Sequence, residues 1–177
     1  RYAPDQLQQD REIVWAAVKQ KGGALQDAAV KFRRDREVVL AAVQQDGDAL
    51  LYASDQLKQD REIVLAAVKQ NGSALPYASD ELKRDREIVL AAVQEDGWAL
   101  QFAVDELKRD KDFVLTAVKE NANALKCITE DREIVLAVVQ QDGLALQYAV
   151  DKMKQDRVVV KAAMNPNEDA VAYAADV

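Results

Sequence analysis

The sequence contains no histidine and only one cysteine in 177 residues. The commonest catalytic base and metal ligand is therefore missing, and an internal disulfide framework is excluded. Glycine (6 residues), proline (3 residues) and aromatic residues (6%) are also scarce. This scarcity argues against collagen-like, disordered and all-β classes, and the abundance of Ala, Val, Leu and Gln favours helices.

Basic clusters and long apolar runs are lacking as well. The 24 Lys and Arg residues are outnumbered by 31 Asp and Glu residues, which gives a net charge of −7. Because binding to a phosphate backbone depends on clustered Lys and Arg, we expect no nucleic-acid partner. The longest apolar runs, such as Ile134 to Val139, have 6 residues, whereas a membrane span needs about 20. We therefore expect no transmembrane segment.

An internal repeat dominates what is present. The string Arg-Glu-Ile-Val-Leu-Ala-Ala-Val, or a close variant, begins at residues 11, 36, 61, 86, 111, 132 and 157, so the period is 25 residues except for one step of 21. Repeats of this length are typical of solenoids. We predict an all-α fold, an α-solenoid of seven roughly 25-residue two-helix repeats. It would occupy residues 1–177 as a single repeat array, with half repeats at both ends.

The first helix of each repeat carries the stronger signal. In the third copy, Asp60 is a good N-cap, and residues 63–68 are apolar on all sides of the helix, which predicts burial on most sides. Asn71 and Gly72 would end this helix. We expect a second helix to begin with Ser73 as its N-cap and to carry a single apolar stripe, formed by Leu75, Ala78 and Leu82.

Charged residues recur at fixed positions of the repeat. An acid occupies one column in every copy, and a base follows it: Asp10, Asp35, Asp60, Asp85, Asp110, Asp131 and Asp156, then Arg11, Arg36, Arg61, Arg86, Lys111, Arg132 and Arg157. A catalytic group is needed once per site, whereas a residue present in every repeat serves the repeat. We therefore interpret these columns as helix caps followed by a ladder of charges along the stack. An enzyme or ligand-binding domain that uses groove carboxylates is an unfavoured alternative.

Candidate contact residues are found where a column is broken. Trp98 and Leu144 occupy positions that hold a capping residue in most other repeats, and Leu51 is apolar in a column of mostly Gln, Lys or Pro. Loss of a cap costs about 1 kcal/mol, and aromatic residues often anchor partners. Trp98, Leu144 and Leu51 are therefore candidate partner contacts. In the alternative, Trp98 folds back onto the adjacent repeat.

The step of 21 residues is the second irregularity. Four residues are missing around Cys127, close to one helical turn. The apolar face stays nearly in phase after such a deletion, so the array should continue with a kink. Cys127 stands where other repeats have Tyr or Phe, and a small buried thiol is expected there rather than a nucleophile, which would need a nearby base.

The segments Asp60 to Val68 and Asn71 to Ser79 together resemble a helical repeat family of unknown function. The resemblance covers essentially the whole chain, and the family is common in algae and protists. It implies a repeat protein, and it assigns no catalytic residues and no ligand residues.

These observations predict a non-enzymatic helical-repeat scaffold or protein–protein interaction module, an accessory or bridging subunit of a larger assembly. We expect no cofactor and no metal site, and the partner would be another protein or a multi-subunit complex. The resemblance suggests a narrower alternative, a peripheral subunit of an algal photosynthetic membrane complex. That alternative would place the chain in a plastid; otherwise the sequence indicates no compartment.

Overall fold

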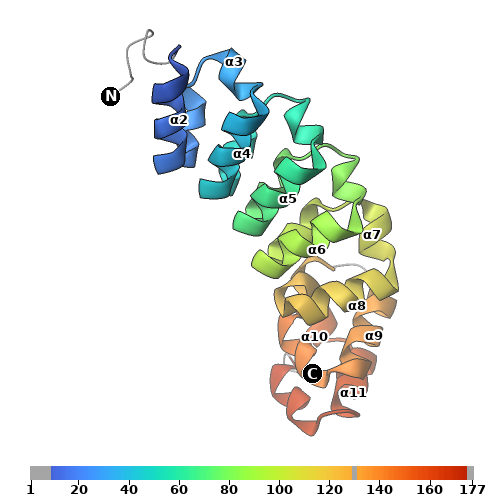
Figure 1. The fold of residues 1–177 in the computed structure, drawn as a ribbon. Helices are drawn as coiled ribbons and strands as arrows, with labels where there is room; N and C mark the ends of the chain where they lie inside the picture. Colours follow the sequence, from blue (N-terminus) through green and yellow to red (C-terminus); the bar gives the residue numbers. More distant parts are fainter. Residues whose placement is uncertain (1–8, 129–130, 175–177) are drawn as a thin grey trace. The chain divides into compact units, whose positions relative to one another are not determined.

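The structure, a computed structural model of the chain, describes residues 9–128 and 131–174. Every regular element in these ranges is a helix, which confirms the all-α prediction. The chain divides into two compact units, residues 1–95 and 96–177, and each is described by itself (Figure 1). The half repeat expected before residue 9, the Thr129–Glu130 part of the shortened repeat and the last residues of the terminal half repeat lie outside the described residues.

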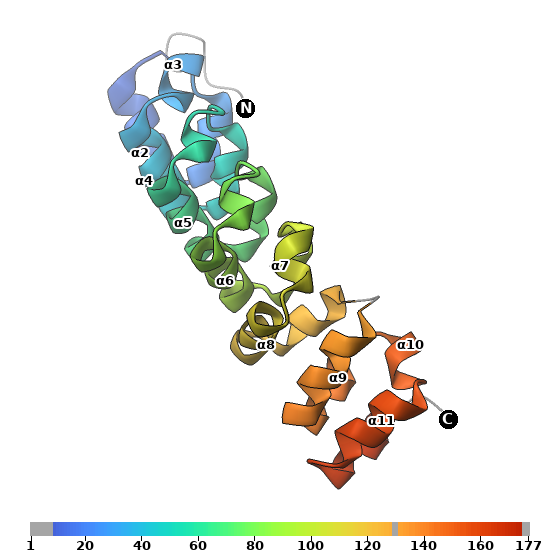
Figure 2. The ribbon, with the colours of Figure 1, turned by 90° about the vertical axis from the view of Figure 1, so that its right-hand side faces the viewer.

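The first unit is built from two layers of helices. One layer consists of ten-residue α-helices that pack side by side in chain order (Figure 2): α2 (Arg11–Gln20), α4 (Arg36–Gln45), α5 (Arg61–Gln70) and α6 (Arg86–Glu95). The other layer consists of six-residue 3₁₀ helices: η1 (Gly22–Asp27), η2 (Gly47–Tyr52) and η4 (Gly72–Tyr77). Short helices connect the layers: α3 (Val30–Arg33), η3 (Leu57–Gln59) and η5 (Leu82–Arg84).

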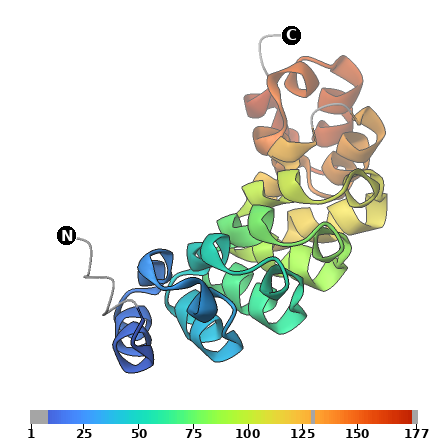
Figure 3. The same cartoon turned by 90° about the horizontal axis from the view of Figure 1, so that it is seen from above.

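The second unit repeats this scheme. Its longer helices are α8 (Lys111–Glu120), α9 (Arg132–Gln141) and α11 (Arg157–Met164), and its 3₁₀ helices are η6 (Gly97–Phe102), η7 (Ala122–Cys127), η8 (Gly143–Tyr148) and η9 (Glu168–Tyr173). The connecting helices are α7 (Asp105–Arg109) and α10 (Asp151–Lys154). The longer helices and the 3₁₀ helices each pack on their counterparts in the next repeat, and the succession of elements can also be followed from above in Figure 3. The predicted α-solenoid is confirmed.

The second helix of the repeat is shorter than the sequence suggested. Ala78, in the middle of the expected stripe, is extended (φ −70°, ψ 158°) and separates η4 from η5. The next residue, Ser79, donates its backbone N–H to the carbonyl of Lys58 in the preceding repeat (3.0 Å), and Ser54 does the same to Arg33 (2.9 Å). The break in the helix therefore frees backbone groups for hydrogen bonds between repeats.

The caps of the α-helices are as expected, but those of the second helices are not. Asp60 accepts from the backbone N–H groups of Glu62 (3.0 Å) and Ile63 (3.2 Å), which confirms it as the N-cap of α5. Ser73, however, is not the cap of η4, because the side chain of Asn71 accepts from the N–H of Ser73 (3.0 Å). The backbone N–H of Asn71 also donates to Ala67 (2.9 Å). The residue directly after the α-helix, here Asn71, thus both ends the α-helix through its backbone N–H and caps the 3₁₀ helix through its side chain.

The core lies between the two layers. Ile63, Val64, Ala67 and Val68 of α5 are fully buried, whereas residues 65–66 are half-buried, so α5 leaves one side partly open to solvent. The 3₁₀ helices η2, η4, η6, η7 and η8 contribute to the core through consecutive buried Ala and Leu residues: Ala49, Leu50, Ala74, Leu75, Ala99, Leu100, Ala124, Leu125, Ala145 and Leu146. The second helix of the repeat therefore also contributes to the core.

The glycine that follows most of the ten-residue α-helices allows two repeats to approach closely. No glycine in the described ranges has positive φ, so the glycine is not required there for a left-handed backbone. A Cβ atom on Gly47 would instead lie 2.5 Å from the carbonyl oxygen of Ala67, and one on Gly143 would lie 2.1 Å from that of Ala163. Both distances are far shorter than a van der Waals contact, so these positions exclude a side chain. Ala122 stands at this position in η7.

Candidate functional site

The column of basic residues forms the predicted ladder between repeats. Arg36 donates from Nε to Asp60 (2.8 Å) and from its terminal nitrogen to Glu62, both in the following repeat. The same arrangement joins Arg11 to Asp35 and Glu37, and Arg61 to Asp85 and Glu87. We call each such arginine with its two carboxylates a rung. Each rung holds one guanidinium between an Asp and the Glu two residues later.

The Asp of a rung has two roles, one for each carboxylate oxygen. In Asp60, Oδ1 caps helix α5 while Oδ2 accepts from Arg36. Partial burial alone would raise the pKa of Asp60, but the hydrogen bonds from Arg36 and the two backbone N–H groups outweigh it and lower that pKa. The pKa of Arg36 is raised by its hydrogen bonds to Asp60 and Glu62. Both groups are therefore held in their charged forms.

The rung in the second unit shows what happens when one carboxylate is absent. Val158 replaces the second acid, and Arg132 binds both oxygens of Asp156 instead, at 2.6 and 3.0 Å. The hydrogen bond from Arg132 is the largest influence on Asp156 and places its pKa well below the ordinary value. An arginine in this column thus finds a carboxylate in the next repeat even when the Glu is missing.

The junction between α8 and α9 lacks a rung. Lys111 takes the place of the arginine, and it forms no ion pair with any residue in the described ranges. Asp131 still caps its helix, accepting from the N–H groups of Glu133 and Ile134, both at 3.1 Å. Its second oxygen and the carboxylate of Glu133 are without a described ion-pair partner. This is also the junction at which four residues are missing from the repeat.

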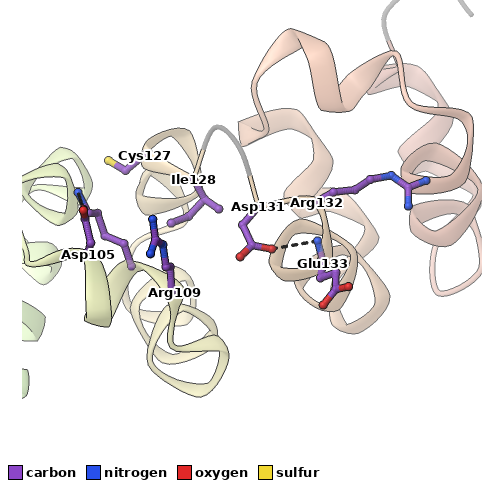
Figure 4. A pocket seen from close by; sticks show the side chains of 8 residues that line it. Asp105, Arg109, Cys127, Ile128, Asp131, Arg132 and Glu133 are labelled. Atoms are coloured by element: carbon purple, nitrogen blue, oxygen red, sulfur yellow. Dashed lines mark hydrogen bonds and ion pairs between the residues drawn. The ribbon is translucent and has the colours of Figure 1, made fainter.

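A cleft of about 510 Å³ opens at the same junction. Its walls come from α7, from Cys127 and Ile128 at the end of η7, and from Asp131, Arg132 and Glu133 at the start of α9. In Figure 4, Asp131 and Glu133 lie on one side and Arg109 and Cys127 on the other, while Arg132 extends away. A complete repeat has a short connecting helix between its 3₁₀ helix and the next α-helix. The described residues show none between η7 and α9, so the deletion leaves the space.

Cys127 is a half-buried thiol in this cleft wall. Its Sγ lies 3.8 Å from the carbonyl oxygen of Gly97 and 3.7 Å from that of Trp98. Burial raises the pKa of the Cys127 thiol above its ordinary value. Because the thiolate is the reactive form, this environment supports the interpretation of Cys127 as a small packing residue.

Trp98 and Leu144 retain the caps that the sequence analysis assumed to be lost. Asp96 accepts from the N–H of Trp98 (2.9 Å), and Asp142 accepts from the N–H of Leu144 (3.0 Å). The expected cost of a missing cap is therefore wrong, because the cap lies two residues earlier than was assumed. Both residues sit on well-formed 3₁₀ helices, where their side chains are not required for capping.

The surroundings of Trp98 separate it from the other two candidates. Its side chain is 48% exposed, and the ammonium group of Lys126 lies 5.8 Å from the centre of its ring and 6.0 Å from that of Tyr148. Leu144 is half-buried. Because η6, η7 and η8 pack in order, Trp98 and Leu144 occupy the same position of repeats in one layer. Leu51 is 43% exposed and belongs to the other unit.

The acidic pair of the junction was missed by the sequence analysis. Two features of the sequence coincide with it: Lys111 interrupts the arginine column, and the deletion lies beside Cys127. Alignment of the ion-pair partners across repeats would have linked them, since both fall on the same junction.

The described residues contain no group of three or more Cys, Asp or Glu side chains placed to hold a metal ion. None of the helices in the described ranges is both long and apolar enough to cross a membrane.

Comparison with known proteins identifies the repeat. The family model described as Domain of unknown function (DUF4116) matches four times in tandem, over residues 1–33, 35–83, 85–130 and 131–174. The match over residues 35–83 spans about two of the 25-residue periods, so the unit of the family is a pair of repeats. No curated protein and no solved structure matches the chain. The four matches cover nearly the entire chain, which therefore belongs to this family of helical repeats.

Proposed function

We propose that the chain is a non-enzymatic interaction module, which acts as an accessory or bridging subunit by docking onto another protein. Trp98 carries this proposal. It is half exposed on a capped 3₁₀ helix that also carries the partly exposed Phe102, and the ammonium group of Lys126 lies over its ring. Exposed aromatic side chains on a rigid support often anchor protein interfaces.

The organisation of the charges supports a structural role for them. The Asp of the column caps an α-helix in each repeat, and in the rungs it also binds the arginine of the preceding repeat. Exposed ion pairs contribute about 0–1 kcal/mol each, and we assign the rungs to the alignment of neighbouring repeats. The net charge of −7 favours a protein partner over nucleic acid. No observation favours the narrower photosynthetic hypothesis, and we do not propose it.

The test is to isolate the native assembly and to map its contacts by chemical cross-linking and mass spectrometry. Cross-links to one partner should concentrate around η6 and η7, and Trp98→Asp should weaken binding of that partner to the purified chain by about tenfold or more. Val158→Glu is a matched control, because Val158 is 54% exposed in the same unit and Glu is the residue of that column in other repeats. A native chain that elutes alone as a monomer would contradict the proposal. Equal binding by both variants would remove Trp98 from the interface.

A further inference from the structure

The pair Asp131 and Glu133 repeats an arrangement that holds an arginine elsewhere in the chain. In three rungs, an Asp that caps its own helix and the Glu two residues later bind one guanidinium together. Asp131 caps α9 through Oδ1 in the same way, with its two hydrogen bonds at 3.1 Å. The two residue types, their spacing and the capping role of the Asp are therefore preserved at the junction where the arginine is replaced by Lys111.

The cations near this pair do not complete it. Lys111 occupies the donor position and forms no ion pair with a described residue, and Arg132 is bound to Asp156 at 2.6 Å. Lys108 is bound to Asp105 at 2.8 Å. Arg109 lies on the opposite side of the cleft (Figure 4) and forms no ion pair in the described part of the chain. Asp131 and Glu133 thus line the cleft without an ion-pair partner among the described residues.

The cleft beside the pair has room for a ligand. Its volume of about 510 Å³ lies within the range of about 300–1,000 Å³ that is usual for binding pockets. In the regular repeats of the first unit, a connecting helix such as η5 precedes the next α-helix. The deletion and the Lys that interrupts the arginine column fall at the same junction, which therefore has both a cleft and an acidic pair without an ion-pair partner among the described residues.

We propose that this cleft binds an arginine side chain of a partner protein, whose guanidinium bridges Asp131 and Glu133 as the chain's own arginines bridge the other pairs. The inference rests on the proposed interaction function and assigns a second contact to it. Arginine is favoured over lysine because a planar guanidinium offers two donors to two carboxylates. Arg109 on the opposite wall is placed to bind a carbonyl or carboxylate of the same partner segment.

The test uses the ¹⁵N-labelled full chain and two blocked pentapeptides, Gly-Gly-Arg-Gly-Gly and Gly-Gly-Lys-Gly-Gly. The arginine peptide should cause saturable shifts of the Glu133 and Ile134 amide signals, with an apparent Kd on the order of millimolar. The affinity for the lysine peptide should be at least about fivefold lower. Equal responses to both peptides, or no saturable shift with the arginine peptide, would overturn the proposal.

Three variants make the result specific. Glu133→Gln should weaken binding of the arginine peptide about fivefold, whereas Glu62→Gln, the same change in an occupied rung, should leave it unchanged. Arg109→Gln should alter the affinity by less than about twofold, because one exposed contact contributes little. If Arg109 itself occupied the acidic pair, this variant would shift the Glu133 amide before peptide is added and would strengthen binding instead, and that result would overturn the proposal.

Failure of this inference is distinguishable from failure of the proposed function. If the native partner still binds and depends on Trp98 while the arginine peptide does not bind, the interaction function stands and the cleft has no part in it. If the peptide binds as expected but no native assembly exists, the cleft is a guanidinium site and the interaction module is contradicted.

Discussion

The regular junctions of the first unit and the shortened junction of the second unit are built from the same repeat, yet they differ in three respects. The junction of α4 with α5 has an arginine rung, a glycine that allows close approach and a backbone hydrogen bond from Ser79 to the preceding repeat. The junction of α8 with α9 has Lys111, Ala122 and a cleft. The rung and the close-approach glycine that join neighbouring repeats are thus both replaced at the shortened junction, where these two substitutions coincide with the deletion.

The largest difference should appear on deletion of a buried leucine. Leu50 and Leu125 are equivalent and fully buried. Leu50→Ala should lower the free energy of unfolding by about 3–5 kcal/mol. Leu125→Ala should lower it by only about 2 kcal/mol, because a less extensively packed junction collapses more readily around the cavity. Urea denaturation followed by circular dichroism measures both. Leu51→Ala, at an exposed neighbour, should change stability by less than about 0.5 kcal/mol. Equal losses at Leu50 and Leu125 would contradict the comparison.

Substitution of the close-approach glycine should have the next largest effect. Gly47→Ala places a Cβ atom 2.5 Å from the carbonyl oxygen of Ala67, and it should lower the free energy of unfolding by about 1–3 kcal/mol. The reciprocal change Ala122→Gly relieves no contact and should cost only about 0.5–1 kcal/mol of backbone entropy. Urea denaturation measures both effects. If Gly47→Ala left the free energy of unfolding unchanged, the two repeats would be able to move apart to make room for the Cβ atom.

Acid should weaken the rungs, whose stabilising effect depends on ionised Asp side chains. Asp60, Asp85 and Asp156 have pKa values below their ordinary range. The stability they contribute is complete above the unfolded-state pKa of about 3.9 and is lost as the pH falls through the lower folded-state pKa. The melting temperature should therefore fall between about pH 4 and pH 2. This slope should become shallower in Arg61→Gln and stay unchanged in Lys111→Gln; a steeper slope in either variant would refute the assignment.

The smallest effect is the coupling within a single rung. A double-mutant cycle of Arg36→Gln and Glu62→Gln should give a coupling energy of up to about 1 kcal/mol that decreases in about 1 M salt. The equivalent cycle of Lys111→Gln and Glu133→Gln should give a value near zero, because that pair is not formed. A coupling at Lys111 as large as that at Arg36 would mean that the rung exists after all and would remove the basis for the cleft proposal.

The sequence predicted the features that repeat and missed those that depend on neighbouring copies. Asp60 was identified as a cap, and the Arg column as a ladder, because both follow from local chemistry and a fixed spacing. The cap of the 3₁₀ helix was placed at Ser73 instead of Asn71, because an α-helix was assumed to begin after Gly72. A 3₁₀ helix with an extended residue after it is selected by hydrogen bonds to the preceding repeat, such as that of Ser79, and these are not visible in a single copy.

The candidate contacts show the same division. Trp98 was found because it breaks a column, and its exposure supports the interest in it, but the reason first given, a lost cap, was wrong. Leu144 breaks the same column and is half-buried. A departure from the consensus therefore identifies a candidate contact position. The exposure of the side chain at that position is determined by the packing of the adjacent 3₁₀ helices.

The amino-acid sequence alone determined that this protein is a helical array, because a 25-residue period of short amphipathic segments can bury its apolar residues only against further copies. The tertiary structure decided where that array is open. At one junction, a deletion and a Lys substitution that are separate in sequence coincide with a cleft and with two acids, Asp131 and Glu133, that have no ion-pair partner among the described residues. Only the stacking of repeats brings an arginine within reach of carboxylates about 25 residues away. The replacement of that arginine by Lys111 therefore affects the acidic pair of the next repeat, which the sequence of a single copy does not show.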